Sequence, residues 1–220
     1  MKKIVALMLA LMLCLSMTAM AEVPSKTASD AVDVIAVTEN EPEAGAPALD
    51  VKLVSDLDMT EEELAQYEAL EKIADAEVEK IKEAESVEAY FADAKDAEGN
   101  AADLKSIVGT DGELAVYELY GLVASNYDAE LGKVTACLQL PTPYAEGEKV
   151  AVMIGLINKG ENDEYTVDWT ALPGTVENIE STTEGVETVS AVKVEIEPEL
   201  MTAIQNGDAI VAVVSKAVSE

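Results

Sequence analysis

The stretch "LAVYELYGLVA" (residues 114–124) marks the point where the sequence changes from a helical to a strand pattern. From Leu114 onward the apolar residues recur mainly with period two, as they do in half-buried strands. Turn-rich segments separate the strands at short, regular spacing, and no long helix lies between them, which favours an antiparallel immunoglobulin-like β-sandwich over a doubly wound parallel sheet. The further strand candidates are residues 133–140, 149–157, 165–172, 191–197 and 209–215, with 174–180 as a candidate seventh strand.

Upstream of this stretch the apolar residues have helical spacing. Thr60 and Glu63 fit a capping box, in which a hydroxyl and a carboxylate satisfy the free amides at a helix start. Apolar residues then recur from Leu64 to Ile81, which predicts an amphipathic helix over residues 60–84. A shorter helix is predicted to restart at Ser86, and residues 102–108 add one or two further turns.

Two β-branched segments, residues 32–39 and 48–57, precede this helix and are predicted to pair as a short β-hairpin. The sequence therefore predicts an α+β chain. Its predicted parts are a signal peptide (1–21), a flexible leader (22–31), a hairpin with helices (32–112) and a β-sandwich domain (113–220).

The first residues predict export. Lys2 and Lys3 form a basic start, residues 4–15 an apolar core, and residues 19–21 an A-x-A cleavage site. The apolar run is shorter than the roughly 20 residues that span a bilayer. We therefore expect a secreted protein, extracellular or at the cell surface, with no membrane insertion after signal cleavage. Lipid attachment at Cys14 is the alternative, although Leu13 is a poor residue before a lipidated cysteine.

Charge and cysteine content narrow the possible partners. Loss of Lys2 and Lys3 with the signal peptide lowers the formal net charge from −30 to −32. Such a surface repels phosphate backbones, so nucleic acid is not an expected partner. Cys137 is then the only cysteine, which excludes an intramolecular disulfide. Strand alternation places Cys137 on a face with Thr135 and Gln139, partly exposed.

The segment "PELMTAIQNGDAIVAVVS" (198–215) predicts a helix followed at once by a strand. Pro198 suits a first helical turn, and Gly207 is predicted to end the helix in a left-handed conformation. A helix of this length would carry the chain from one sheet of a sandwich to the other, so no chemistry is assigned to this turn.

Three segments, "GKVTACLQLPTPYAEGEKVAVMIGLI", "VDWTALPGTVE" and "PELMTAIQNGDAIVAVVS", carry a resemblance. They resemble the C-terminal module of uncharacterised secreted proteins of Gram-positive gut anaerobes, over about 100 residues from Leu114 to Ser215. The segment from Glu177 to Ser190 is longer here than in that pattern. The resemblance implies an immunoglobulin-like sandwich in an extracellular setting, and it implies no activity and no functional residues.

The sequence carries no recognisable catalytic motif. It has no histidine to act as a general base, no G-x-S-x-G elbow, no phosphate loop and no dinucleotide fingerprint. We therefore expect a protein that is not an enzyme. A hydrolase that uses a pair of carboxylates stays open, because the 44 acidic residues allow many close pairs.

The aromatic residues give the candidate ligand site. Trp169 alternates with polar residues in "YTVDWTAL" (165–172), so the sequence predicts that Trp169 and Tyr165 face the core. In the alternative, Trp169 and Tyr165 form a platform for sugar rings, together with Tyr127 or Tyr144.

Calcium is the one ion that this composition favours, because it prefers carboxylate and carbonyl oxygens. The acidic loop 158–164 offers Asn158, Glu161 and Asp163, although their spacing matches no calcium motif. Otherwise no cofactor is predicted.

The leading functional hypothesis is a secreted, non-catalytic interaction or structural protein that binds an extracellular protein or glycan. The first alternative is an extracellular carbohydrate-binding or calcium-dependent adhesion module. The second is a secreted carboxylate-type hydrolase.

Overall fold

The computed structural model describes residues 33–55, 60–141, 144–160, 164–180 and 188–217. The predicted signal peptide and leader, residues 1–31, lie outside the described residues. Each strand and helix predicted within the described part has a counterpart in the structure.

The strands form one continuous, mainly antiparallel sheet. Their order is β1-β5-β8-β7-β6-β9-β4-β2, and β3 adds a short parallel pairing to β7. The β-rich, antiparallel character predicted from the alternation is confirmed. The strands are β1 (Asp33–Thr38), β2 (Asp50–Val54), β3 (Lys95–Asp96), β4 (Leu114–Ser125), β5 (Val134–Gln139), β6 (Lys149–Lys159), β7 (Tyr165–Glu180), β8 (Thr188–Ile196) and β9 (Asp208–Lys216).

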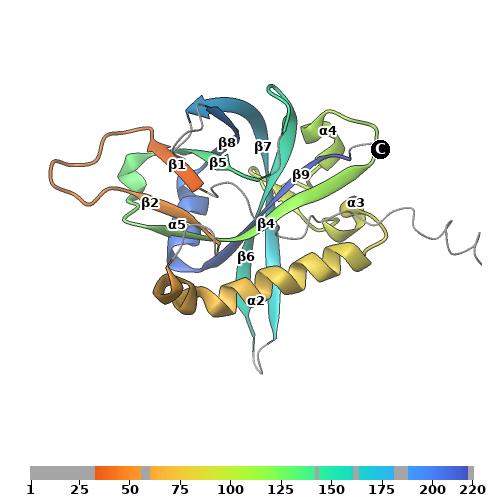
Figure 1. The fold of residues 1–220 in the computed structure, drawn as a ribbon, viewed down its shortest axis with the longest axis horizontal. Coiled ribbons are helices and arrows are strands. Elements are labelled where there is room, and N and C mark those ends of the chain that lie inside the picture. Colours follow the sequence, from red (N-terminus) through yellow and green to blue (C-terminus); the bar gives the residue numbers. More distant parts are fainter. Residues whose placement is uncertain (1–32, 56–59, 142–143, 161–163, 181–187, 218–220) are drawn as a thin grey trace, which may run out of the picture.

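The sheet curls until its two edges almost meet. β1 and β2 stand at opposite ends of the strand order, yet Cα atoms of the two strands lie within 8 Å of each other (Figure 1). The immunoglobulin-like sandwich is not confirmed, because the described strands join one sheet rather than two separate ones.

The predicted β-hairpin within residues 32–112 is wrong. β1 pairs with β5, and β2 pairs with β4, so each strand extends the sheet formed by the C-terminal strands. The physical reason is the apolar face of each strand. Leu53 on β2 and Val34 on β1 pack into the inner core of the sheet, which offers far more apolar surface than an isolated two-stranded hairpin.

β7 makes the bend that allows this closure. Residues 165–175 pair with β6, and residues 174–180 pair with β8. At the bend a Cβ on Gly174 would lie 2.9 Å from Cγ2 of Val150 and 3.2 Å from Cγ1 of Val192. Only glycine fits between strands that approach so closely. The two predicted strands 165–172 and 174–180 are therefore one strand with a corner.

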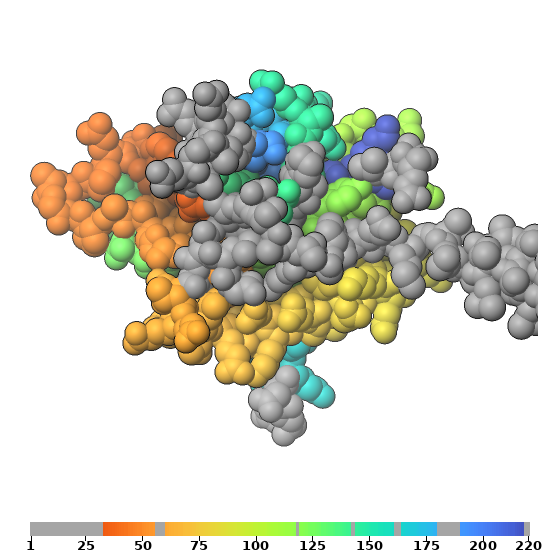
Figure 2. Space-filling model, in the orientation of Figure 1, coloured from red at the N-terminus to blue at the C-terminus, as the bar shows by residue number. Residues whose placement is uncertain are grey.

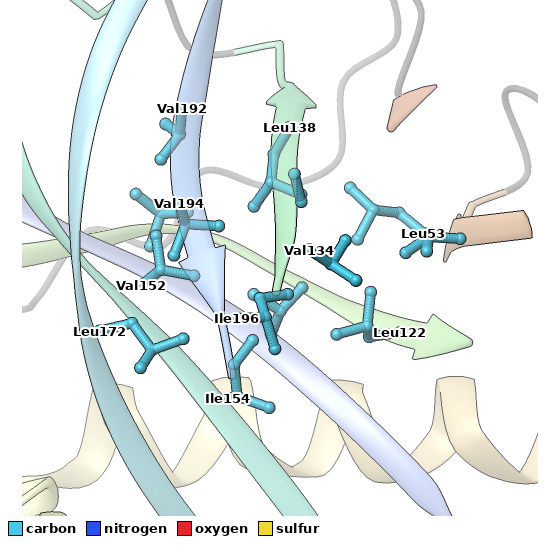
Figure 3. Packing of buried hydrophobic residues seen from close by; sticks show 14 of the residues in the cluster. Leu53, Leu122, Val134, Leu138, Val152, Ile154, Leu172, Val192, Val194 and Ile196 are labelled. Carbon is cyan, nitrogen blue, oxygen red and sulfur yellow. The ribbon is translucent and has the colours of Figure 1, made fainter. Parts of the chain in front are cut away.

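The concave face of the sheet encloses the inner core. Valine, leucine and isoleucine side chains from six strands point toward one another there (Figure 3). Burial of each such side chain contributes about 1.5–3 kcal/mol, so this core is the main source of stability. The residues labelled in Figure 3 are Leu53, Leu122, Val134, Leu138, Val152, Ile154, Leu172, Val192, Val194 and Ile196.

Helix α5 (Pro198–Asn206) adds Met201 and Ile204 to the inner core. Pro198 occupies the first turn, as predicted. The predicted left-handed conformation of Gly207 is wrong: its φ of −134° and ψ of −171° are extended. The reason is that β9 begins at the next residue, so the chain leaves the helix directly in a strand conformation.

Three helices cover part of the convex face. The long helix α2 (Glu61–Glu83) lies across it as a ridge, with the start of β7 emerging beyond the helix (Figure 1, Figure 2). The predicted capping box is confirmed, because Thr60 N–H donates to Glu63 and Glu63 N–H donates to Thr60. Helices α3 (Val87–Tyr90) and α4 (Leu104–Val108) complete the layer, and a short 3-10 helix, Ala129–Leu131, follows β4.

Candidate functional site

One face of α2 brings a charged residue into the layer between helix and sheet. The buried residues of α2 are Leu70, Ala74, Glu77 and Ile81, which follow one another at helical spacing. Glu77 therefore points inward although it is ionisable, and its side chain is only 3% exposed. A carboxylate in this position needs partners, because an unpaired buried charge is strongly unfavourable.

Glu77 has a partner for each of its oxygens. Lys80 Nζ lies 2.6 Å from Oε1, and the Tyr90 hydroxyl donates a short hydrogen bond to Oε2. Lys80 also donates a 3.4 Å hydrogen bond to the Tyr165 hydroxyl, and its Nζ lies 4.5 Å from the centroid of the Tyr165 ring. These four residues, the Glu77 network, join α2 to α3 and β7.

The pKa values of Tyr90, Tyr165 and Lys80 are all raised in this network. Burial, followed by the hydrogen bond to Glu77, raises the pKa of Tyr90 well above its usual value. Burial, followed by the nearby Glu77 carboxylate, raises the pKa of Tyr165, whereas Lys80 acts in the opposite direction. For Lys80, burial lowers the pKa, but the hydrogen bonds to Glu77 and Tyr165 outweigh it and the net shift is upward. Near neutral pH both phenols are protonated and Lys80 is charged.

Trp169 lies beside this network under α3. Its ring centroid is 5.0 Å from that of Phe91 and 6.2 Å from that of Tyr90, both in edge-to-face geometry. On the neighbouring strand, a Cβ on Gly155 would lie 2.8 Å from Cζ3 of Trp169, so the glycine leaves the room that the indole fills. Trp169 is 9% exposed, which confirms its predicted burial. The core that it joins is the outer one, between sheet and helices, rather than the inner one.

A pocket of about 340 Å³ opens where these elements meet. Glu77 and Lys80 come from α2, Tyr90 from α3, and Trp169 from β7. The segment that follows α3 and the strand β3 supply the opposite wall, with exposed charged side chains of both signs. The volume lies at the lower end of the range found for small-molecule sites.

The four aromatic residues proposed from the sequence do not meet in one place. Trp169 belongs to the outer core and the half-buried Tyr165 packs against it, whereas Tyr127 and Tyr144 are buried in the inner core, on the other face of the sheet. The Tyr127 hydroxyl donates to the carbonyl of Gly132 at 2.6 Å. The Tyr144 ring packs edge-on against that of Tyr117, 6.3 Å between centroids.

The acidic loop 158–164, the candidate calcium site, is described only in part. Asn158 is exposed, and its side-chain amide donates to Asp168 at 2.9 Å. Glu161 and Asp163 lie outside the described residues. Among the residues that are described, no three potential ligands from cysteine and the acidic residues come together as a metal site.

Cys137 is half-buried on the outer face of β5, as the alternation predicted. Burial, and next the negative charge of Glu177, raise the pKa of its thiol, and Lys193 acts in the opposite direction. Gln139 on the same face is buried to 1% exposure rather than partly exposed, and neither polar atom of its amide has a hydrogen-bond partner among the residues that the structure describes.

The sequence reasoning missed Glu77, Lys80 and Tyr90 as a group. A signal for Glu77 existed: it lies three residues after Ala74 and four before Ile81, inside an otherwise apolar stripe. No comparable signal links Tyr90 to Glu77 or to Trp169, because the three meet only through the packing of α2, α3 and β7.

Comparisons with known proteins identify no relative of this chain. No protein-family model matches the chain, and no curated protein and no solved structure matches it significantly. Within the described part of the chain, no helix is both long and apolar enough to cross a membrane.

Proposed function

We propose that this chain is an extracellular, non-catalytic binding protein, and that its ligand site is the pocket between α2, α3 and β7. The observation that carries the proposal is the buried Glu77 at the wall of an open pocket, held by Lys80 and Tyr90. An ion pair with a buried member is seldom more stabilising than well-packed apolar residues of similar volume, and here Glu77 is buried while Lys80 is half exposed. A ligand that uses the charged wall gives such a pair a role that stability alone does not.

The chemistry of the pocket supports binding over catalysis. Both oxygens of Glu77 already accept hydrogen bonds, from Lys80 and Tyr90, so a substrate would have to compete with these partners for the carboxylate. Tyr90 and Lys80 have raised pKa values, which makes both poor general bases near neutral pH. A carboxylate hydrolase would have to rely on Asp93 and Asp168, and both are exposed at the pocket. A carboxylic general acid is typically held in a buried, apolar setting instead.

The extracellular part of the proposal rests on the export signal in residues 1–21 and on the acidic composition. Together they favour a partner met outside the cell, whether a protein or a glycan. The pocket is too small for a folded partner, so it favours a small molecule or a single unit of a polymer.

Thermal unfolding with added ligands tests the proposal. A ligand that binds only the folded state raises the melting temperature. The chain from Glu22 onward is screened against saccharides, amino acids and polyamines, beside a variant with the pocket filled, Thr170→Phe. The matched control is Thr166→Phe, an exposed position four residues earlier on β7. We expect a compound that stabilises the wild type and the control but not Thr170→Phe, and that mass spectrometry recovers unchanged.

Two results contradict the proposal. Conversion of the bound compound to a product would make the protein an enzyme. Equal stabilisation of the wild type and Thr170→Phe would place the ligand elsewhere.

A further inference from the structure

We infer that the pocket takes a neutral, polyhydroxylated ligand, a sugar residue of an extracellular saccharide. This inference rests on the proposed function and adds the ligand class to it. The inference follows from the charges around the pocket, from the pairing of Glu77 with Lys80, and from the apolar wall of the pocket.

An anionic ligand does not fit the electrostatics. Asp93 and Asp168 both border the pocket, and the chain as a whole is strongly acidic. An added carboxylate or phosphate would lie beside these groups and be repelled by the surrounding surface. The two lysines at the pocket do not reverse this balance, because Lys80 is already paired with Glu77.

A cationic ligand does not fit either. The place where an ammonium group would gain most is beside Glu77 and over the Tyr165 ring, since both attract a positive charge. Lys80 already occupies it, 2.6 Å from the Glu77 carboxylate and 4.5 Å from the ring centroid. A ligand amine would have to displace Lys80 and would also meet Lys95 on the opposite wall.

An apolar ligand would fill the pocket at a high cost in desolvation. It would cover the Glu77–Lys80 pair and the side chain of Asp168, which accepts from Asn158, without replacing the water that hydrates their exposed sides. Only a ligand with its own hydrogen-bonding groups avoids this loss.

A sugar residue matches what remains. Each sugar hydroxyl both donates and accepts, so it can accept from Lys95 and donate to Asp93, and the Thr170 hydroxyl can serve in either sense. The C–H face of the ring has an apolar wall to contact in Val167 and the exposed part of Trp169. Phe91 packs edge-on against Trp169, so the indole offers a sugar a small contact rather than a full stacking platform.

The experiment titrates glucose, galactose, mannose and N-acetylglucosamine into the chain from Glu22 onward and measures binding by calorimetry at low and high sodium chloride. Spermidine and citrate serve as the cationic and anionic probes. Asp93→Ala and Lys95→Ala remove the exposed pocket groups, and Asp75→Ala and Lys72→Ala are the matched controls on the exposed face of α2.

We expect at least one sugar to bind with an affinity that salt leaves unchanged, because screening acts on charged ligands. We expect each pocket variant to weaken that affinity at least tenfold and each control to change it less than twofold. Binding of spermidine or citrate that is salt-sensitive and lost in Asp93→Ala or Lys95→Ala, with no sugar binding, would overturn the ligand class and leave the proposed function standing. No binding of any probe, or binding that the pocket variants do not change, would overturn both.

Discussion

The hydrogen bond between the buried Glu77 and the half-buried Tyr90 predicts a measurable energetic coupling. Glu77→Ala removes the carboxylate, Tyr90→Phe removes only the hydroxyl, and the double variant removes both. Glu79→Ala is the matched control, since Glu79 also pairs with a lysine of α2 three residues away but is exposed.

The magnitudes follow from what each change leaves behind. In Glu77→Ala the half-buried Tyr90 hydroxyl loses its acceptor, which costs roughly 1–3 kcal/mol, and the loss of one buried methylene group adds about 0.8 kcal/mol. Lys80 adds little, because its side chain is 52% exposed and returns to water. We expect the free energy of unfolding to fall by about 3 kcal/mol in Glu77→Ala and about 1.5 kcal/mol in Tyr90→Phe. The double variant should lose about 1 kcal/mol less than the sum.

Urea unfolding, followed by the fluorescence of the single tryptophan and by circular dichroism, measures these values. With a slope of about 2 kcal/mol per molar urea, the midpoint of Glu77→Ala should fall by about 1.5 M. Glu79→Ala should stay within about 0.3 M of the wild type. Strictly additive losses, or a Glu77→Ala midpoint equal to that of Glu79→Ala, would refute the buried, coupled network.

Three further predictions follow from the same structure. The pKa of Tyr90 is raised in the folded state, so its contribution to the free energy of unfolding is fully present below about pH 10 and declines as the pH rises above that value. The urea midpoint should therefore fall less with rising pH in Tyr90→Phe than in the wild type, and an equal fall would contradict the raised pKa. Gly174→Ala should lower the unfolding free energy by about 1–3 kcal/mol, since its Cβ would lie 2.9 Å from Val150, and an unchanged urea midpoint would contradict the corner in β7. Cys137 of the folded protein should react with iodoacetamide at pH 8 several-fold more slowly than Cys137 of the unfolded chain, because burial raises the pKa of its thiol, and equal rates would contradict this. Non-reducing electrophoresis should show mainly monomer.

The elements themselves could be predicted because their signals are local. The Thr60 and Glu63 pair fixes the start of α2, and the alternation of apolar residues fixes which face of each strand is buried. Strand pairing could not be predicted in the same way. Alternation says that Val34 and Leu53 face inward, but not that β1 lies beside β5 and β2 beside β4, since those pairings join residues far apart in the sequence.

The corner in β7 shows a second limit. Pro173 and Gly174 look like a break between strands, because proline removes a donor and glycine favours turns. In the structure β8 pairs only from Gly174 onward, so Pro173 borders β6 alone. The Pro173–Gly174 pair, which usually marks the end of a strand, lies here at a bend within one strand.

The candidate site was predictable in part. The burial of Trp169 followed from its place in an alternating strand. Its role beside a pocket did not, because the pocket requires the packing of α3 and of the segment after it against β7. Asp168 and Thr170 alternate with Trp169 in the sequence, and no sequence signal shows that both residues line the pocket.

The indole N–H resonance of Trp169 gives the most direct test of the claim that this pocket is a binding site. A chain with one tryptophan gives one such signal in a nitrogen-15 correlation spectrum, and that indole lines the pocket. We predict that the sugar that binds in calorimetry shifts this resonance in a saturable way, in the wild type and in Thr166→Phe but not in Thr170→Phe. A resonance that stays in place while the sugar binds would contradict the account, because the ligand would then occupy another part of the molecule.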